Sequence, residues 1–389
     1  MRLPAGARPQ ALQPRGRAPP GACGSWYHEF SPMRPPLLLL LAAAAGLSQS
    51  ISIEDYEPKS GLVVPQHPVA RARYPVIDVH NHLRRLTPER VDQLVADMDR
   101  IHLQVMVNLS GGSGEALKEN IRMLKDRYAK RFIVFANLDF TAIDEPGWSA
   151  RAVAQLEQDV AAGAGGLKIF KNLGLDLKDS AGRRIAVDDP RFASVWEACG
   201  RLRIPVLIHT GEPPGLFQPM DRFNERWLEL KRYPSRGRPP DRYPTFEAVM
   251  AEQHRIFERH PKTTFINAHL GWLGGNLGEL GRLLDRLPNV YTEIGAVIEE
   301  LGRQPRFARQ WFLKYQDRVL FGKDTWNPVE YGTYFRILET ADEYFDHDRK
   351  HHGLWKVYGL DLPDPVLQKL YYANARKIFP GIDPAPFRK

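Results

Sequence analysis

The stretch Asp78-Val79-His80-Asn81-His82 follows directly on the apolar run Pro75-Val76-Ile77. A short apolar run that ends in polar residues predicts a buried strand leading into a loop. Residues i and i+2 of an extended strand point to the same side, so His80 and His82 are expected to face one point in space. Two imidazoles placed in this way can bind one metal ion, although the His-x-His spacing alone is a weak motif.

Three later strand-like segments each end on a further side chain that can bind a metal. The run 205–208 leads into His209, the run 264–268 into His269, and the run 318–323 into Asp324. Imidazole nitrogens and carboxylate oxygens suit zinc and similar divalent ions, and a catalytic site keeps one coordination position open. A single histidine at a strand end is most often a polar residue facing a loop. Four strand ends of this kind in one chain predict a metal site.

Short apolar runs recur along the chain and alternate with amphipathic segments. Strands are predicted near residues 75–80, 104–109, 132–138, 165–170, 205–209, 263–269, 290–295 and 318–323. Helices are predicted between them at 89–102, 115–128, 150–162, 190–202, 246–260, 276–287 and 305–315. Strands that alternate with helices predict a parallel sheet, and eight such units predict an α/β fold of the (β/α)8 TIM-barrel type. The potential ligands then lie at the carboxyl ends of strands, where this fold carries its chemistry.

The 389 residues divide into three predicted parts. Residues 1–50 form a leader with a signal peptide, because a short charged start at Met33 precedes an apolar stretch and small residues. The alternative is a disordered basic leader in a cytoplasmic protein. Residues 51–73 form an extended arm, and residues 74–389 form the barrel. The apolar stretch, about ten residues, is too short for a stable membrane span, so we expect a protein exported to the periplasm or secreted.

Composition narrows the classes of function. The net charge is +8, but five arginines and one glutamate within residues 1–50 supply +4 of it, which leaves +4. No basic stripe or nucleic-acid-binding motif accompanies that charge, so nucleic acid is not an expected partner. Cys199 is the only cysteine after the leader, which excludes an intrachain disulfide in an exported protein. No serine-hydrolase elbow, P-loop or Rossmann glycine pattern is present.

The longest irregular insert follows the predicted fifth strand and spans residues 212–245, with seven prolines. A long loop at this position in a compact fold is usually functional. We interpret it as a partial lid, and the alternative is a surface excursion packed on its own aromatic residues. Its aromatic side chains include Phe217, Phe223, Trp227 and Tyr233. Three later histidines, at 347, 351 and 352, have charged neighbours and are expected in a solvated segment without a site.

Taken in order, these motifs resemble those of the amidohydrolase superfamily. The resemblance is to the amidohydrolase-related branch, which includes the aminocarboxymuconate-semialdehyde decarboxylase-like enzymes. It covers roughly residues 74–380 and rests on Ile77–His82, Ile208–Gly211, Ala268–Gly271, Leu320–Asp324 and a terminal helix at Tyr372–Phe379. The resemblance implies a TIM barrel and a metal-dependent enzyme, and it does not specify a substrate.

By this resemblance, one divalent ion, with zinc as the expected metal, is bound by His80, His82, His209 and Asp324. His269 would act beside the metal by orienting or deprotonating the bound water and later returning a proton. A metal lowers the pKa of bound water to roughly 7, the range in which an imidazole titrates. The alternatives for His269 are a fifth ligand or a structural residue. Asp324 could instead serve mainly as a proton acceptor.

Four further residues are candidates for substrate binding. Lys168 lies at the end of the predicted fourth strand, and binuclear relatives carry a carboxylated, metal-bridging lysine there. Binding of a substrate carboxylate is the preferred role for Lys168, and it could also have neither role. Arg84 and Arg85 could face an anionic substrate, although basic residues in loops are usually solvated. Glu293 could contact substrate or orient a ligand.

The sequence therefore predicts a metal-dependent hydrolase in which metal-bound hydroxide attacks an amide, ester or lactone carbonyl. The substrate is expected to be a small organic molecule, such as a carboxylate or a lactone. One alternative is a non-oxidative decarboxylase on the same scaffold. Another is a binding protein that kept the barrel without catalysis. The sequence is compatible with an oligomer and shows no stable membrane span.

Overall fold

The computed structural model describes residues 50–388, so the predicted leader lies outside the described residues except for Ser50. Residues 50–57 belong to one compact unit and residues 58–388 to a second. Residues 58–73, most of the predicted arm, contain neither helix nor strand. Two contacts hold the end of this segment to the rest of the second unit: His67 Nδ1 lies 2.5 Å from Asp342 Oδ1, and Arg73 Nη1 lies 2.7 Å from Asp364 Oδ1.

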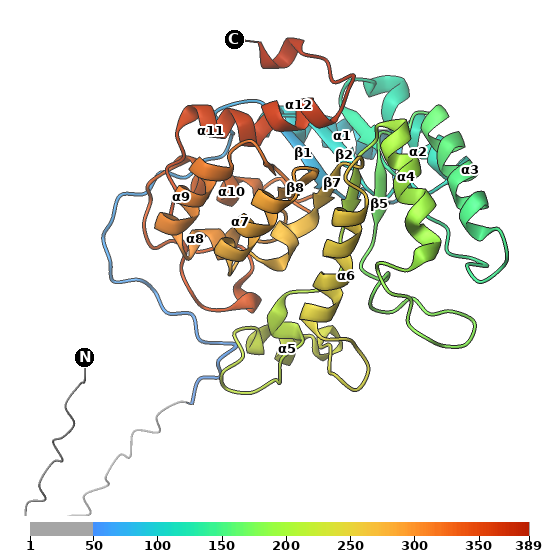
Figure 1. Ribbon diagram of the computed structural model, residues 1–389. Coiled ribbons are helices and arrows are strands. Elements are labelled where there is room, and N and C mark those ends of the chain that lie inside the picture. The colour runs from blue at the N-terminus through green and yellow to red at the C-terminus, as the bar shows by residue number, and fades with distance from the viewer. Residues whose placement is uncertain (1–49, 389) are drawn as a thin grey trace, which may run out of the picture. The chain divides into compact units, whose positions relative to one another are not determined.

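All eight predicted strands are present and parallel (Figure 1). They are β1 (Val76–Asn81), β2 (Leu103–Asn108), β3 (Phe132–Val134) with β4 (Ala136–Asn137), β5 (Leu167–Ile169), β6 (Val206–Ile208), β7 (Phe265–Asn267), β8 (Val290–Glu293) and β9 (Val319–Leu320). The predicted third strand is divided at Phe135, whose amide bonds to Asn108 O in β2, whereas the next amide bonds to Gly166 O. Strand numbers after this point are therefore one higher than in the sequence prediction.

The last strand lies beside the first. The amide of Val79 donates to Phe321 O at 2.9 Å, and the amide of Asp324 donates to His80 O at 2.7 Å. Asn81 and Asp324 also form a parallel bridge. The segments that carry the first and last predicted ligands are therefore neighbours in space although they lie at opposite ends of the barrel sequence.

Helices separate the strands at the predicted places. They are α1 (Pro88–Ile101), α2 (Gly114–Tyr128), α3 (Trp148–Ala161), α4 (Ala193–Leu202), α5 (Trp227–Arg232), α6 (Phe246–Arg259), α7 (Leu277–Arg286), α8 (Ile298–Gly302), α9 (Pro305–Tyr315), α10 (Tyr331–Glu339), α11 (Asp364–Gln368) and α12 (Asn374–Ile378). A π-helical turn, Lys369–Ala373, joins α11 to α12 and completes the predicted terminal helix. None of the described helices has the length and apolar character needed to cross a membrane.

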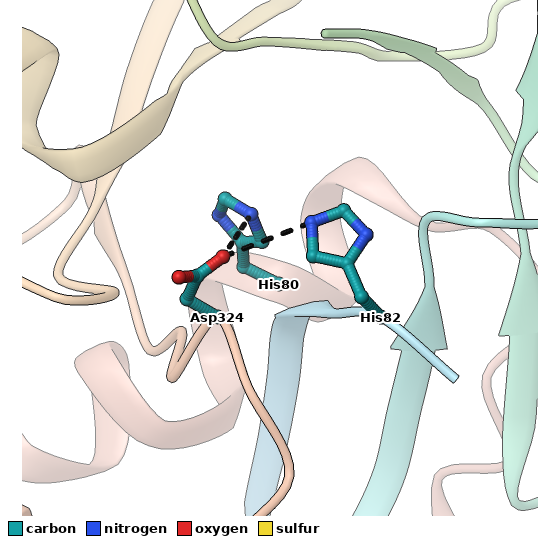
Figure 2. A group of neighbouring side chains, drawn as sticks. All are labelled: His80, His82 and Asp324. Carbon is teal, nitrogen blue, oxygen red and sulfur yellow. Dashed lines mark ion pairs between the residues drawn. The ribbon is translucent and has the colours of Figure 1, made fainter. Parts of the chain in front are cut away.

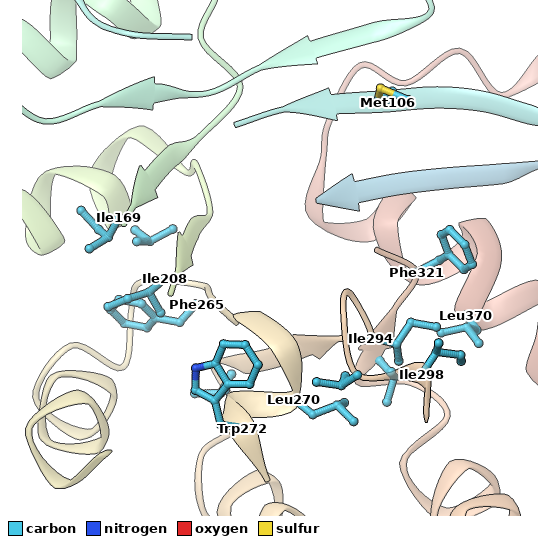
Figure 3. Close-up of a cluster of buried hydrophobic side chains, with 14 of the residues drawn as sticks. Met106, Ile169, Ile208, Phe265, Leu270, Trp272, Ile294, Ile298, Phe321 and Leu370 are labelled. Atoms are coloured by element: carbon cyan, nitrogen blue, oxygen red, sulfur yellow. The ribbon is translucent and has the colours of Figure 1, made fainter. Parts of the chain in front are cut away.

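Successive side chains along the strands point to opposite faces and pack into two hydrophobic cores. One core fills the space between strands and helices and includes Ile169, Ile208 and Phe265 (Figure 3). The other contains strand residues of the opposite parity, such as Ile77, Val79, Leu207, Ile266 and Leu320. This second core occupies the barrel interior, as expected when successive side chains of a strand point to opposite faces.

The insert at residues 212–245 is more regular than the sequence predicted. It contains α5 and two short 3-10 helices, Pro214–Leu216 and Pro234–Arg236. Figure 1 shows α5 at the end of the unit opposite to α11 and α12. Phe217 packs on Phe246 with ring centroids 5.9 Å apart, whereas the Phe223 side chain is 79% exposed. The aromatic residues of the insert therefore do not form a single packed group.

Candidate metal centre

Three predicted ligands converge at the carboxyl ends of β1 and β9 (Figure 2). His80 Nε2 lies 3.3 Å and His82 Nε2 lies 3.7 Å from Asp324 Oδ1. One ligand atom from each residue lies within 4.8 Å of the others. The sequence expectation that His80 and His82 face one point therefore agrees with the structure, and Asp324 completes a compact set of three donors.

A bulge in β1 contributes to the direction of His80. Asp78 pairs with Met106 of β2 but Asn81 pairs with Asn108, so β1 holds one more residue than β2 between these pairs. Bulges next to active sites commonly redirect a side chain. Val79 packs in the barrel interior, and His80, the next residue, also reaches the donor group there. Without the extra residue, alternation would place these two side chains on opposite faces.

The second ring nitrogen of each β1 histidine has a partner. His80 Nδ1 donates to Glu293 Oε1 at 2.9 Å, and His82 Nδ1 lies 2.9 Å from Ser110 Oγ. With Nδ1 held in this way, Nε2 is the nitrogen left for a metal, an arrangement typical of metal-binding histidines. Ser110 was missed by the sequence analysis. It follows β2, so the rule that drew attention to polar residues after strands could have found it.

Glu293 lies behind the donor group and not at its open side. Its carboxylate accepts hydrogen bonds from His80, from the amide of His269 at 2.6 Å and from the amide of Gly295 at 2.5 Å. Burial alone would raise the pKa of Glu293, but His80 and the His269 amide lower it to about 2. Because both carboxylate oxygens are engaged, the geometry favours the orienting role over the predicted contact with substrate.

His209 and His269 form a pair beside the three donors. His269 Nδ1 donates to Gly295 O at 2.6 Å, and His269 Nε2 lies 3.2 Å from His209 Nδ1. His209 Nε2 is buried and has no hydrogen-bond partner among the described residues. The His269 ring lies 4.7 Å from the His80 ring, centroid to centroid. His209 is thus next to the predicted site, but it is not a member of the compact three-donor group.

The backbone after β7 has an unusual conformation. His269, Leu270 and Trp272 have φ values of 56°, 55° and 57°, and Asp324 has a φ of 84°. Residues with side chains rarely adopt this region, and such strain is concentrated at functional sites. The Trp272 ring stacks on the His269 ring with centroids 4.4 Å apart and restricts its orientation. No sequence pattern marked Trp272, which lies three residues after His269.

Lys168 lies within the barrel interior near the donors. Its side chain is about 1% exposed, and Nζ has no hydrogen-bond partner among the described residues. Nζ lies 5.5 Å from the centroid of the Phe170 ring, which in turn is 5.6 Å from the His82 ring. Burial lowers the pKa of Lys168 to about 7, and the carboxylates of Asp324 and Glu293 oppose that shift. A buried ammonium without an acceptor is costly, which suits a group that meets a ligand.

The protonation states of the cluster fit a divalent cation. Burial lowers the pKa of His82 to about 2, of His269 to about 4 and of His209 well below its usual value. For Asp324, burial opposes ionisation, but the neighbouring histidines hold its pKa well below the usual range. These three imidazoles are therefore neutral and the carboxylate is charged at pH 7, as metal ligation requires. Burial acts to lower the pKa of His80, but Glu293 and Asp324 outweigh it and raise that pKa, so a metal at His80 Nε2 would have to displace a proton.

A second group of histidines, which the sequence predicts to be solvated, is instead mostly buried. His347 and His352 are only 6% and 3% exposed, which corrects the sequence interpretation. His352 Nδ1 lies 2.5 Å from Glu299 Oε1, and His352 Nε2 lies 3.8 Å from Glu229 Oε1. Glu229 and both adjacent histidines could meet one ion, but Arg226 and Arg236 already pair with Glu229. These two guanidinium groups disfavour a cation there.

The sequence model of a family described as amidohydrolase matches residues 77–381, more than half of the chain. The chain belongs to this amidohydrolase family. The resemblance predicted from the four strand-end motifs is confirmed, and the protein is an enzyme of a metal-dependent family. No curated protein sequence matches the chain.

Solved structures share the fold at low identity. A 2,6-dihydroxybenzoate decarboxylase in complex with 2,6-dihydroxybenzoate aligns with a TM-score of 0.51 and 14% identity, over 79% of this amidohydrolase and 99% of that chain. A 4-oxalomesaconate hydratase from Rhodopseudomonas palustris has a TM-score of 0.46 and 14% identity, over 80% and 97% of the two chains. A zinc-bound amidohydrolase from Burkholderia multivorans has a TM-score of 0.43 and 15% identity, over 78% and 98%. The first of these similarities, together with the strand order, confirms the TIM barrel.

Proposed function

We propose that this amidohydrolase hydrolyses an amide, ester or lactone carbonyl of a small organic substrate. The observation that carries the proposal is the convergence of His80 Nε2 and His82 Nε2 on the ionised Asp324 carboxylate. These three residues, with His209 beside them, would hold one divalent ion, and zinc is the metal that the donor types favour. Such an ion, when bound, lowers the pKa of water to roughly 7 and polarises a carbonyl.

His269 is the residue we assign to proton transfer. Its Nδ1 is fixed as a donor by Gly295 O, so its Nε2 carries the lone pair that can accept a proton. This nitrogen lies 3.2 Å from His209 Nδ1, a longer contact than the 2.6 Å between His269 Nδ1 and Gly295 O. His269 would take a proton from the attacking water at Nε2 and give it to the leaving group. Stacking on Trp272 keeps the ring in place for both steps.

Lys168 is the residue we assign to substrate binding. Its Nζ lies 5.5 Å from the centroid of the Phe170 ring, and the Phe170 ring lies 5.6 Å from the His82 ring. This Nζ lacks a protein acceptor among the described residues. A carboxylate or carbonyl oxygen of the substrate would supply that acceptor and reduce the cost of the buried ammonium. The second role that we keep open is carboxylation of Lys168 to bridge two metals, as in binuclear relatives.

Decarboxylation is the second candidate reaction, and the buried Lys168 ammonium favours it to the extent that it selects carboxylated substrates. In that reaction the bond between the substrate carbon and its carboxylate breaks, carbon dioxide leaves, and His269 passes to the carbon a proton that its Nε2 has first taken up from solvent. A binding protein without catalysis is disfavoured because all the predicted ligands are present and three of them converge.

Metal content and product analysis test the proposal together. Purified protein, supplemented with zinc and dialysed, is expected to hold about one equivalent of metal by elemental analysis. His80→Ala and Asp324→Ala should lose it, whereas His260→Ala, at the end of α6, should keep it. A panel of lactones, esters, amides and aromatic carboxylates should then release acid, detected by pH-stat titration. Protein that binds no metal overturns the proposal, and release of carbon dioxide in place of acid makes the enzyme a decarboxylase.

A further inference from the structure

A cleft of about 630 Å³ opens directly beside the donor group. Its inner end contains His82, and its walls come from the loop after β1 and from Thr325 and Trp326, which follow Asp324. Both walls therefore begin at a predicted metal ligand. The volume lies in the range of small-molecule sites. A ligand in this cleft would place one end at the donors. Its other end would lie along the loop after β1, near residues 84–90.

The outer part of the cleft has a strong positive charge. Arg84, Arg85 and Arg90 line it, and none of the three forms an ion pair with another of the described residues 50–388. Asp97 is the one carboxylate among the lining residues, and it pairs with Arg100 at 2.6 Å. Guanidinium groups that line one cleft without a carboxylate partner favour an anion there.

Three other basic groups near the barrel mouth share one carboxylate partner. Lys171 lies 2.5 Å and Arg238 lies 3.0 Å from Glu212 Oε1, and Arg236 lies 3.6 Å from Glu212 Oε2. This contrast matters because exposed arginines are common on any surface. The cleft beside His82 differs in that its guanidinium groups face a cavity without a carboxylate partner of their own.

Most of the remaining lining of the cleft is apolar. The cleft is also lined by Leu83, Leu86, Leu94 and the half-buried Trp326, together with the polar Gln93 and Thr325. Apolar walls with a few convergent charged groups are typical of sites for small organic ligands. Trp326 also offers a flat face that suits an aromatic or alicyclic body.

We infer that the substrate of this enzyme is an organic acid with an apolar body, whose anionic group binds Arg84 and Arg85 while its reacting group lies at the donors. This inference rests on the proposed function, because it assigns the substrate class of the same site. It separates two anionic contacts: the arginines bind the far end of the substrate, and Lys168 is available to the end that reacts.

Binding of phenylbutyrate and of its uncharged analogue phenylbutanol tests the inference without knowledge of the true substrate. Affinities would be measured by calorimetry on the zinc-loaded enzyme and again after chelation, which removes direct carboxylate binding to metal. The double variant Arg84→Ala, Arg85→Ala should weaken phenylbutyrate binding about 10-fold or more, the size of lost charge-assisted hydrogen bonds. It should leave phenylbutanol unchanged, whereas Trp326→Ala should weaken both.

The double variant Arg122→Ala, Arg127→Ala is the matched control, because both arginines are exposed on α2, their loss removes the same two charges, and neither lines the cleft. Equal affinity for acid and alcohol, no binding of either, or the same loss in the control as in the cleft variant would overturn the inference. Failure of the proposed function is distinguishable, since it shows as missing metal or missing turnover while phenylbutyrate still binds through the arginines.

Discussion

His80 Nδ1 lies 2.9 Å from Glu293 Oε1, and both side chains are fully buried. This contact determines which nitrogen of His80 is left for a metal, because the carboxylate can only accept the Nδ1 proton. The same carboxylate also accepts the amide of His269. One residue on β8 therefore orients a ligand from β1 and the loop after β7.

Replacing Glu293 with Gln should lower zinc affinity roughly 10- to 100-fold, the usual cost of losing a partner behind a metal-binding histidine. The amide group of Gln would bring an N–H donor against the donors of His269 and Gly295 that the carboxylate now accepts. Competition with a chromophoric chelator measures the affinity. Glu119→Gln, on the exposed face of α2, is the control, and equal affinities in both variants would refute the orienting role.

His269→Asn should keep about one equivalent of metal while kcat falls roughly 10²- to 10⁴-fold, the span for a positioned acid or base. The pH profile of kcat should also lose one limb. Elemental analysis and steady-state kinetics on a substrate from the panel measure both effects, with His260→Asn as control. Loss of metal together with activity would make His269 a ligand and favour a binuclear site. Undiminished turnover would move the proton-transfer role to Asp324.

Lys168→Met should make the metal-free protein more stable and the enzyme less active. The buried Nζ has no acceptor among the described residues, so an apolar side chain of similar length should raise the free energy of unfolding by about 1–4 kcal/mol. Urea denaturation measures this change. The variant should retain one equivalent of metal and show a raised KM. Loss of a second equivalent, with an intact-mass decrease matching a carboxyl group, would instead identify Lys168 as a bridge.

Stability should fall as the pH is lowered from 7 to 5, and His254 should account for part of that loss. Burial, assisted by Arg286, lowers the pKa of His254 from 6.5 to about 4. The unfolded chain therefore binds more protons between these values, so stability decreases as the pH falls through this window, by roughly 3 kcal/mol in total for this group. Urea denaturation of wild type and His254→Gln at several pH values should show a smaller pH dependence in the variant. An identical slope in both proteins would contradict the assignment.

We also propose that residues 33–50 direct export. Fusion of this segment to a reporter enzyme should place the reporter outside the cytoplasm, with a new N-terminus near residue 50. A fusion in which Met33 to Ala45 is replaced by a polar linker serves as the control. A reporter that remains inside, on a chain that still begins at Met1, would make the cytoplasmic alternative correct without changing the barrel or its site.

The order of strands and helices could be predicted from the sequence because each element carries its own periodic pattern. Val91, Leu94, Val95 and Met98 form the buried stripe of α1 that their spacing predicts. The helices inside the insert could not be predicted in the same way. α5 is only six residues long, and so short a helix is stabilised by tertiary contacts such as that of Arg226 with Glu300, not by its own pattern.

The sequence by itself determined which side chains could bind a metal and that they follow the strands of a parallel barrel, because strand ends and residue types are local properties. Only the tertiary structure decided what those side chains contact. Glu293 reaches His80 across 213 positions of sequence, and His209 meets His269 through the pairing of β6 with β7. Such contacts depend on register, and a shift of one residue, like the bulge in β1, turns a side chain to the other face.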